Sequence, residues 1–347
     1  MPELVSILIP AYNAERWITD TIRSALGQSW PRKEIIIVDD GSSDDTLSIA
    51  KRFESGSLKV LHQKNKGASA ARNRALLHAQ GDYIQWLDAD DLLASDKISE
   101  QMKIAGSGRS SPVLLSSAFG KFFWRREKAI FTPDALWQDL SPVDWLLEKF
   151  RRNLWLVPAS WLVSRRITEK AGPWNEDLSL DDDGEYFCRA VAASQVVRFV
   201  RQAKTFYRQS GSSQLSRRCT AKSYASLFLS LTLCVRHLRS LEESERTREA
   251  SLILLQRLHT YFHHFADEAV LAEKVNSLAR ELGRELLPEG LAWKWHVLRK
   301  LLGWNAAKRV VNSAKRSKLT MSIYWDRLLY RMAYGKSDLT RKRFPQL

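Results

Sequence analysis

Residues 83–93, with the sequence YIQWLDADDLL, join a strand-like run to a cluster of acids. The first half is apolar, and the second half places three carboxylates within four positions, at Asp88, Asp90 and Asp91. Like charges this close repel one another and disfavour joint ionisation. Oxygen ligands clustered at one point suit a hard divalent cation, Mg²⁺ or Mn²⁺. The stretch therefore predicts a buried strand whose end binds a metal ion.

The sequence before this stretch alternates between strand and helix patterns. Three further apolar runs of strand type occupy residues 5–10, 34–41 and 58–63. Helical spacing of apolar residues, or helix-start signals, fills the segments between them at residues 14–28, 42–53 and 67–79. Continuous apolar strands separated by helices predict an α/β domain with a parallel sheet covered on both faces.

The alternation weakens beyond about residue 106. Residues 110–126 read as one or two strands with a turn at Gly120, and residues 196–210 read as a pair of strands. From residue 216 almost to the end, the pattern is helical. We expect an α/β domain over residues 1–215, with halves at about 1–106 and 107–215, followed by a helical, basic region over residues 216–347.

The charge of the chain is strongly positive and uneven. The formal net charge is +15, and residues 291–347 contain 14 basic and two acidic side chains. Residues 291–318 combine Trp, Leu and Val with Lys and Arg at helical spacing, which is typical of helices that lie on anionic membranes, although solvated bundle helices share it. An anionic partner is expected. No nucleic-acid recognition motif accompanies the charge, so nucleic acid is not expected as a partner.

Other sequence features bear on location. Three cysteines without a CxxC pair argue against a disulfide framework and fit a reducing cytoplasm. No stretch approaches the roughly 20 apolar residues that span a bilayer, and the start of the chain does not resemble a signal peptide. We expect a cytoplasmic protein that is peripheral on the inner face of the membrane.

Ligands in open α/β sheets bind beyond the carboxyl ends of the strands. In this chain those ends carry Tyr12, Asp40 and the acids after residue 87, and the helix after the third strand carries Arg72. Asp40 is placed to accept hydrogen bonds from a base, and Tyr12 to stack on it. Each acidic run alone could be a capped turn, but two runs at neighbouring strand ends favour a metal–nucleotide site.

Four segments, residues 5–30, 34–46, 65–76 and 81–91, resemble the signature segments of family 2 glycosyltransferases. They occur in the family's order and cover roughly residues 4–100. The resemblance implies a GT-A fold, a mixed and mainly parallel sheet flanked by helices, followed here by a helical C-terminal region. It also implies an inverting, metal-dependent transfer of a sugar from a nucleotide sugar.

The resemblance also implies roles for individual residues. It assigns nucleotide-sugar binding to the following set: Pro10, Ala11, Tyr12, Glu15, Asp39, Asp40, Arg72, Asp88 and Asp91. Asp90 would hold the metal, with Asp88 as a possible second ligand. On this basis residues 1–106 form the nucleotide-binding half and residues 107–215 the acceptor half. Many family members place a histidine near the diphosphate where this chain has Ser210, so a third protein ligand is not expected.

An inverting transfer needs a general base for the acceptor hydroxyl. The family takes it from an acidic pair before a helix, and residues 172–191 match that segment. We expect Asp183 to be the base, with Asp182 and Glu185 as alternatives; a purely capping role for these acids is the other possibility. The helix N-terminus should favour the ionised carboxylate that a base requires.

We therefore expect a hexosyl- or N-acetylhexosaminyltransferase that moves a sugar, from a UDP-sugar, to a glycan or lipid-linked saccharide in cell-surface polysaccharide synthesis. Five tryptophans of the acceptor half are candidates for stacking on the acceptor sugar: Trp124, Trp137, Trp145, Trp155 and Trp161. Two alternatives remain open. One is a nucleotide-sugar-binding module without turnover, and the other is a nucleotidyltransferase, although the Gly-rich, lysine-bearing loop typical of that class is missing after the first strand.

Overall fold

The computed structural model describes residues 2–105, 111–209, 220–266, 268–287 and 300–334. Its first sheet has five strands in the order β3-β2-β1-β4-β8. The first four are mutually parallel, and β8 runs antiparallel to β4. The five strands are β1 (Val5–Ala11), β2 (Lys33–Asp39), β3 (Leu58–His62), β4 (Tyr83–Trp86) and β8 (Val163–Ser164).

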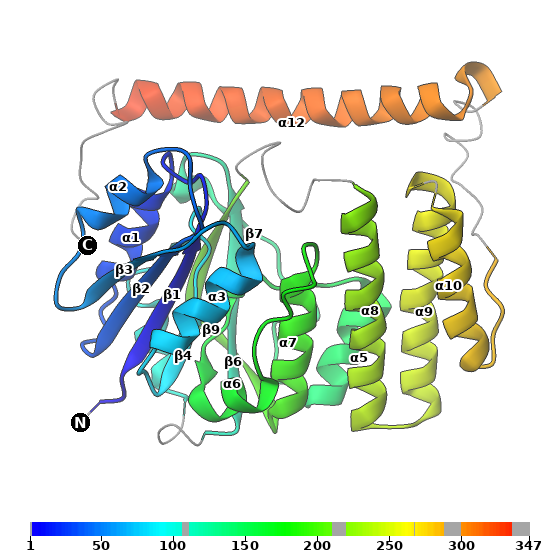
Figure 1. The fold of residues 1–347 in the computed structure, drawn as a ribbon, viewed down its shortest axis with the longest axis horizontal. Helices are drawn as coiled ribbons and strands as arrows, with labels where there is room; N and C mark the ends of the chain where they lie inside the picture. The colour runs from blue at the N-terminus through cyan, green and yellow to red at the C-terminus, as the bar shows by residue number, and fades with distance from the viewer. Residues whose placement is uncertain (1, 106–110, 210–219, 267, 288–299, 335–347) are drawn as a thin grey trace.

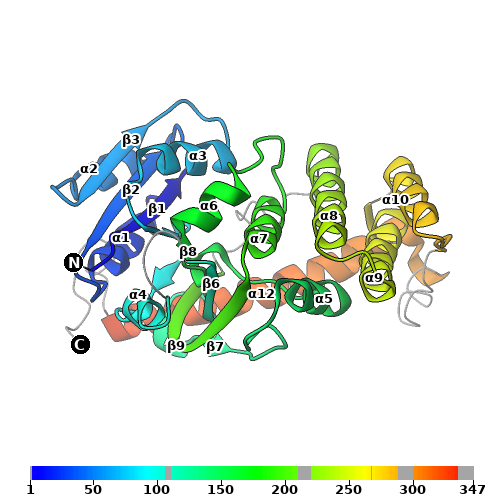
Figure 2. The same ribbon diagram turned by 90° about the horizontal axis from the view of Figure 1, so that it is seen from below.

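The first sheet is the centre of the α/β region, as its apolar strands predict. All four residues of β4 are buried, as are all but one residue of β1. Helices pack on both faces of this sheet (Figures 1 and 2). The helices of this region are α1 (Ile18–Leu26), α2 (Thr46–Lys51), α3 (Ala68–His78), α4 (Lys97–Met102) and α6 (Arg165–Ala171). The predicted fold class, a mixed and mainly parallel sheet flanked by helices, is confirmed.

A second, four-stranded sheet follows; the sequence patterns predict strands at residues 110–126 and 196–210 but not their pairing into a separate sheet. Its order is β5-β9-β6-β7, and the long strands β6 and β9 run parallel to each other. The strands are β5 (Leu92–Leu93), β6 (Val113–Phe122), β7 (Ile130–Phe131) and β9 (Val196–Arg208). Short 3₁₀ turns lie at Arg126–Lys128 and Pro158–Ser160.

Two expectations for this second sheet were wrong. No turn occurs at Gly120: β6 runs straight through it, and a Cβ there would meet the Phe131 ring of β7 at 2.6 Å, so the glycine makes room for that ring. Residues 196–208 form one strand, not a pair, because a register shift opposite Ser117 and Ala118 takes up the extra residues of β9. An irregularity of this kind bends a strand without ending it.

An aromatic cluster joins the first sheet to α7 (Asp182–Ala193). The rings of Trp174 and Tyr186 stack at 4.1 Å with an interplanar angle of 3°, and Trp86 of β4 meets Trp174 edge-on at 5.1 Å. All three side chains are buried. Aromatic pairs of this geometry stabilise beyond their buried area, by about 0.5–1.5 kcal/mol each. The cluster therefore fixes the position of α7 relative to the end of β4.

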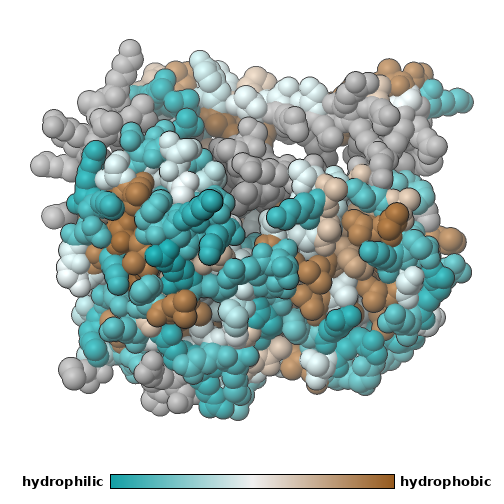
Figure 3. Space-filling model, in the orientation of Figure 1, coloured by the Kyte–Doolittle hydropathy of each residue, from teal (hydrophilic) through white to brown (hydrophobic). Residues whose placement is uncertain are grey.

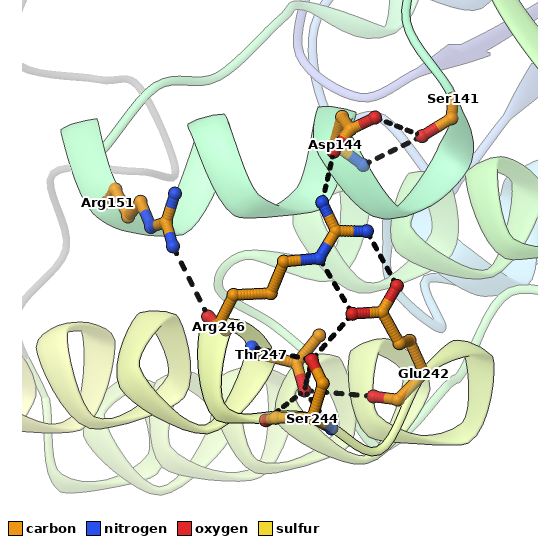
Figure 4. A network of polar contacts seen from close by, with 7 residues as sticks. All are labelled: Ser141, Asp144, Arg151, Glu242, Ser244, Arg246 and Thr247. Atoms are coloured by element: carbon orange, nitrogen blue, oxygen red, sulfur yellow. Dashed lines mark hydrogen bonds and ion pairs between the residues drawn. The ribbon is translucent and has the colours of Figure 1, made fainter.

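A row of helices continues from α7 away from the sheets (Figure 2). It contains α5 (Pro142–Arg152), α8 (Ala221–Leu241), α9 (Glu245–Tyr261), a π-helical turn at Phe262–Ala266, and α10 (Ala269–Glu281). Figure 4 shows how α5 is attached to the α8–α9 turn: Arg246 contacts Asp144 at 2.8 Å and Glu242 at 2.6 Å. The helical region predicted after residue 216 is present.

A long helix, α12 (Trp304–Tyr334), lies across one side of the molecule, along the top of Figure 1. The carboxylate of Asp326 attaches it to the protein: it receives a hydrogen bond from the Trp124 N–H at 2.8 Å and pairs with Arg125 Nε at 2.7 Å. Trp124 in turn packs on Trp17, beyond the end of β1. In the part of the chain that the structure describes, no helix is long and apolar enough to cross a bilayer.

Candidate active site

The carboxylate of Asp40, beyond the end of β2, organises the loop before α3. Its Oδ1 accepts hydrogen bonds from Gln63 Nε2 at 2.7 Å and from the Lys66 N–H at 2.9 Å, and its Oδ2 accepts one from the Gly67 N–H at 2.8 Å. A carboxylate offers about four lone-pair sites. Asp40 therefore retains capacity for one further donor, such as a base N–H, at Oδ2.

Asp39 is fully buried beside it. Its Oδ2 accepts from the Ser42 N–H at 3.2 Å and lies 2.9 Å from His62 Nδ1. Its Oδ1 has no hydrogen-bond partner among the described residues. A buried oxygen without a donor is costly, so this Oδ1 atom is a polar group that a ligand donor could satisfy.

The first strand contributes an exposed aromatic ring. Pro10 and Ala11 end β1, and Tyr12 follows with 45% of its surface exposed. Glu15 is also exposed and accepts a hydrogen bond from the Asp45 N–H at 3.2 Å, which orients it towards the start of α2. Tyr12 and Glu15 are thus both accessible beyond the end of β1.

Arg72 of α3 connects the two groups of acids. Its guanidinium contacts Asp88 at 2.9 Å and Asp182 at 2.7 Å, and it lies 4.3 Å from the ring centre of Trp174. Burial alone would lower the pKa of Arg72, but the negative charges of Asp182 and Asp88 raise it above its usual value. Arg72 therefore remains charged and holds the end of β4 against the start of α7.

Arg208, the last residue of β9, donates hydrogen bonds to the acidic segment that follows β4. The Arg208 N–H donates to Asp91 Oδ1 at 2.9 Å, and its Nε donates to the Asp90 carbonyl at 2.8 Å. The arginine is buried, 4.4 Å from the ring centre of Trp17. The hydrogen bond from Arg208 fixes the buried Asp91 side chain. Asp88 and Asp90 are partly exposed.

The donor set fits a divalent cation that shares its ligands with a substrate. In the described ranges, no group of three or more His, Cys, Asp or Glu side chains is arranged to hold a metal ion by itself. Asp91 Oδ2 is buried without a hydrogen-bond partner, and burial together with the charges of Asp90 and Asp88 raises the pKa of Asp91 well above its usual range. Mg²⁺ commonly takes one or two carboxylates and completes its shell with substrate phosphates and water. Ser210 lies outside the described residues.

The start of α7 brings the acceptor-side acids to this point. Asp181 adopts a left-handed conformation, with φ of 59°, and its Oδ2 accepts a hydrogen bond from Ser230 of α8 at 2.6 Å. Gly184 is required beneath it, because a Cβ there would lie 2.3 Å from the Asp181 carboxylate. Asp181 makes no side-chain capping hydrogen bond to the helix. Asp181 therefore does not cap α7 through its side chain, whereas Asp183 Oδ1 accepts a hydrogen bond from the Gly184 N–H at 2.9 Å.

The pKa of the Asp183 carboxyl is strongly raised. Burial, followed by the charges of Asp182 and Asp181, raises the pKa of Asp183 from 3.8 to about 7, although Arg72 acts in the opposite direction. Burial and the neighbouring charges thus oppose the ionising effect expected of the helix N-terminus on this carboxylate. A helix N-terminus stabilises a nearby anion by about 0.3–1 kcal/mol. Burial and the charges of Asp182 and Asp181 outweigh that stabilisation of the Asp183 carboxylate.

The two alternative candidates for the base, Asp182 and Glu185, both form ion pairs with arginines. Asp182 Oδ2 is bound to Arg72 and also accepts from Ser69 Oγ at 3.3 Å. Glu185 is buried in a two-pronged ion pair with Arg189, at 2.7 and 2.8 Å. Burial would raise the pKa of Glu185, but hydrogen bonds from His237 and Arg189 lower it. Of the three acids, Asp183 keeps a carboxylate that no arginine holds.

Sequence reasoning missed several residues that build the site. Trp174 supports Arg72, Ser230 positions Asp181, and Arg208 holds Asp90 and Asp91. The position of Arg208 at the end of a strand was the one available signal. Among the five candidate tryptophans, Trp145 and Trp161 are buried core residues, whereas Trp155 is 40% exposed.

The sheet order, with acids at the carboxyl ends of parallel strands, defines a GT-A type of α/β fold. Residues 6–165 match the profile of glycosyl transferase family 2. S. aureus TarS 1–349, solved with UDP-GlcNAc, superposes with a TM-score of 0.56 at 16% identity, covering 80% of this chain and 92% of that one. The likeness to TarS concerns the fold.

Curated relatives agree with the family match. The putative teichuronic acid biosynthesis glycosyltransferase TuaG of Bacillus subtilis is 45% identical over 103 residues, 29% of this chain and 41% of TuaG. The Escherichia coli UDP-Glc:alpha-D-GlcNAc-diphosphoundecaprenol beta-1,3-glucosyltransferase WfaP is 47% identical over 103 residues, 29% of this chain and 40% of WfaP. The matches thus span about two fifths of each relative. A glycosyltransferase family 2 domain thus occupies residues 6–165 of this chain, and the fold is of the GT-A type.

Replacing Arg72 with methionine should destabilise the protein and loosen the start of α7. Removing one partner of a buried ion pair leaves like charges uncompensated, and we expect a loss of about 3 kcal/mol in the free energy of unfolding, measured by urea titration. Arg74→Met is the matched control, since Arg74 lies on the same helix with a 3.5 Å contact to Gln63. Asp182→Asn in the Arg72→Met background should recover part of the loss. Equal stability of the two arginine variants would contradict the role given to Arg72.

Proposed function

We propose that this chain is an inverting glycosyltransferase that moves a sugar from a UDP-sugar to a saccharide or lipid-linked saccharide in cell-surface polysaccharide synthesis. The observation that carries the proposal is Asp183, a carboxyl with a pKa of about 7 beside the acids that follow β4. The names of the relatives support it, since WfaP uses UDP-Glc and a diphosphoundecaprenol-linked GlcNAc, and TarS was solved with UDP-GlcNAc.

In the proposed reaction the Asp183 carboxylate takes the proton from an acceptor hydroxyl. The hydroxyl oxygen then attacks the anomeric carbon from the face opposite the nucleoside diphosphate, and the bond to the diphosphate oxygen breaks. One displacement inverts the configuration and needs no covalent enzyme intermediate. A general base works best when its pKa lies near the operating pH, as it does here.

Other residues of the site position the donor. Tyr12 would stack on the base, Asp40 would accept from it at Oδ2, and the Arg72 charge would lie close to the nucleotide. A divalent cation held by Asp90, with Asp88 as a second ligand, would offset negative charge on the leaving diphosphate. Arg72 holds Asp88 and the start of α7 at a fixed distance from each other. The proposed donor and acceptor sites would therefore keep a constant separation.

We also propose that α12 lies on an anionic membrane surface. Its outer side carries exposed apolar residues at helical spacing, among them Met321, Tyr324, Trp325 and Met332, which are 55–74% exposed. The helix contains seven basic residues and one acid, and that acid, Asp326, is used for attachment to the protein. Figure 3 shows hydrophobic residues on α12 above a largely hydrophilic face. Apolar and basic residues together suit the interface of an anionic bilayer.

The first test measures the pH dependence of sugar transfer. Because the base acts when deprotonated, the rate should rise with pH and level off above about 7, following the raised pKa of Asp183. Asp183→Asn should lower turnover by about 10²–10⁴-fold and remove this pH limb. Asp177→Asn, at an exposed acid nearby, is the control. UDP binding without any turnover of UDP-sugars would indicate a binding module, and release of diphosphate from a nucleoside triphosphate would indicate a nucleotidyltransferase.

The second test concerns the metal, with calorimetry of UDP binding as the readout. Manganese should tighten UDP binding to the unmodified protein, and Asp90→Ala should weaken the manganese-dependent part by about tenfold or more, which corresponds to about 1.4 kcal/mol. Asp96→Ala serves as a control, because Asp96 is exposed and makes no side-chain capping bond. Turnover that persists in a chelator, with UDP affinity independent of manganese, would exclude this assignment.

The third test uses vesicles. The protein should sediment with phosphatidylglycerol-containing vesicles more than with phosphatidylcholine vesicles, and Trp325→Ser with Met321→Ser should reduce the bound fraction by about fivefold or more. Leu77→Ser is the control, since Leu77 is 85% exposed on α3, outside α12. Equal binding to both kinds of vesicle, or competition by nucleic acid, would rule out the membrane surface.

A further inference from the structure

A cluster of side chains on the second sheet forms a platform beside the candidate active site. It consists of Phe119 and Lys121 of β6, Tyr207 of β9, and Trp155, and we call it the Trp155 platform. The Trp155 ring lies 5.2 Å from Phe119 and 5.7 Å edge-on from Tyr207, measured between ring centres. The Lys121 ammonium lies 4.9 Å from the centre of the Trp155 ring. These contacts hold an indole in a fixed orientation.

The register of the second sheet places this platform next to the acids. Lys121 pairs with Tyr207 across β6 and β9. The next residue of β9, Arg208, donates its N–H to Asp91 Oδ1. The acids also affect the Tyr207 phenol. Burial raises the pKa of Tyr207, and the negative charges of Asp91 and Asp183 raise it further. Tyr207 is therefore the member of the platform that adjoins the carboxylates of the site.

Trp155 is unlike the core tryptophans near it. It is 40% exposed, whereas Trp145 and Trp161 are 2% and 0% exposed and meet each other edge-on at 5.4 Å. An exposed indole that is held by two rings and a cation loses little conformational freedom when a ligand binds. Its face suits the apolar C–H side of a sugar ring.

Lys121 adds an exposed positive charge beside a site whose arginines, Arg72 and Arg208, are buried against its acids. It is exposed, and within the described residues it forms no ion pair, so its charge is offset by ring faces and by the distant carboxylate of Asp134. An anionic acceptor would be repelled by the carboxylates after β4 and at the start of α7. A cation on the acceptor side would compensate for that repulsion.

We propose that the Trp155 platform is the acceptor subsite, and that it binds a saccharide carrying a phosphate or diphosphate. The sugar stacks on Trp155 with its reacting hydroxyl towards Asp183, and Lys121 binds the phosphate. This inference rests on the proposed function, because it assumes that a saccharide enters from this side. It assigns the specificity for a phosphorylated acceptor to Lys121 and the affinity for the sugar ring to Trp155.

The test compares two probes in the presence of UDP: a short alkyl α-GlcNAc diphosphate and the uncharged alkyl α-GlcNAc glycoside. The unmodified protein should bind the diphosphate probe about tenfold or more tightly than the uncharged one, by calorimetry. Lys121→Gln should remove most of this preference without changing affinity for the uncharged probe. Trp155→Ala should weaken binding of both probes about tenfold, and Trp155→Phe should retain most of it.

Lys204→Gln is the matched control, because Lys204 is an exposed lysine of β9 that also lies near a ring, Phe131, at 5.9 Å. Equal affinity for the two probes, absence of binding of both, or equal effects of Lys121→Gln and Lys204→Gln would overturn the proposal. UDP affinity, measured on every variant, should be unchanged. Failure of the unmodified protein to bind UDP would instead count against the proposed function. Failure of the acceptor subsite and failure of the proposed function are therefore distinguishable.

Discussion

The arrangement of this site depends on one buried guanidinium. Arg72 binds Asp88 on one side and Asp182 on the other, and the Trp174 ring lies against it. Without a shared cation, the end of β4 and the start of α7 would present carboxylates to each other across a short distance. The ion pairs replace this repulsion with a defined spacing between the end of β4 and the start of α7.

The local pattern of the first hundred residues carries most of the fold information. Each parallel strand is an apolar run, so its existence, its direction and the acids beyond its end could be read from neighbouring residues. The contact between Arg72 and Asp182 could not, because the two residues are 110 positions apart and only the packed structure brings them together. The pairing of strands into a second sheet was missed for a related reason: the role of Gly120 depends on Phe131 of a different strand.

The protonation of Asp183 shows the same limit at the level of charge. A helix N-terminus is visible in sequence and predicts an ionised carboxylate. Burial and the placement of the Asp181 and Asp182 charges are properties of the folded chain, and they act in the opposite direction with larger effect. The sequence could thus indicate where the acidic cluster before α7 lies, whereas the direction of the pKa shift of Asp183 required the structure.

The hydrogen bond from Ser230 to Asp181 has a consequence for how the chain can be divided. Ser230 belongs to α8, beyond the boundary at residue 215 that the sequence patterns suggest. The left-handed turn that presents Asp183 is therefore built jointly by residues on both sides of that boundary. The helical region is therefore a structural part of the candidate site, and a fragment ending at residue 215 would contain every candidate catalytic residue without the Ser230 contact that supports the start of α7.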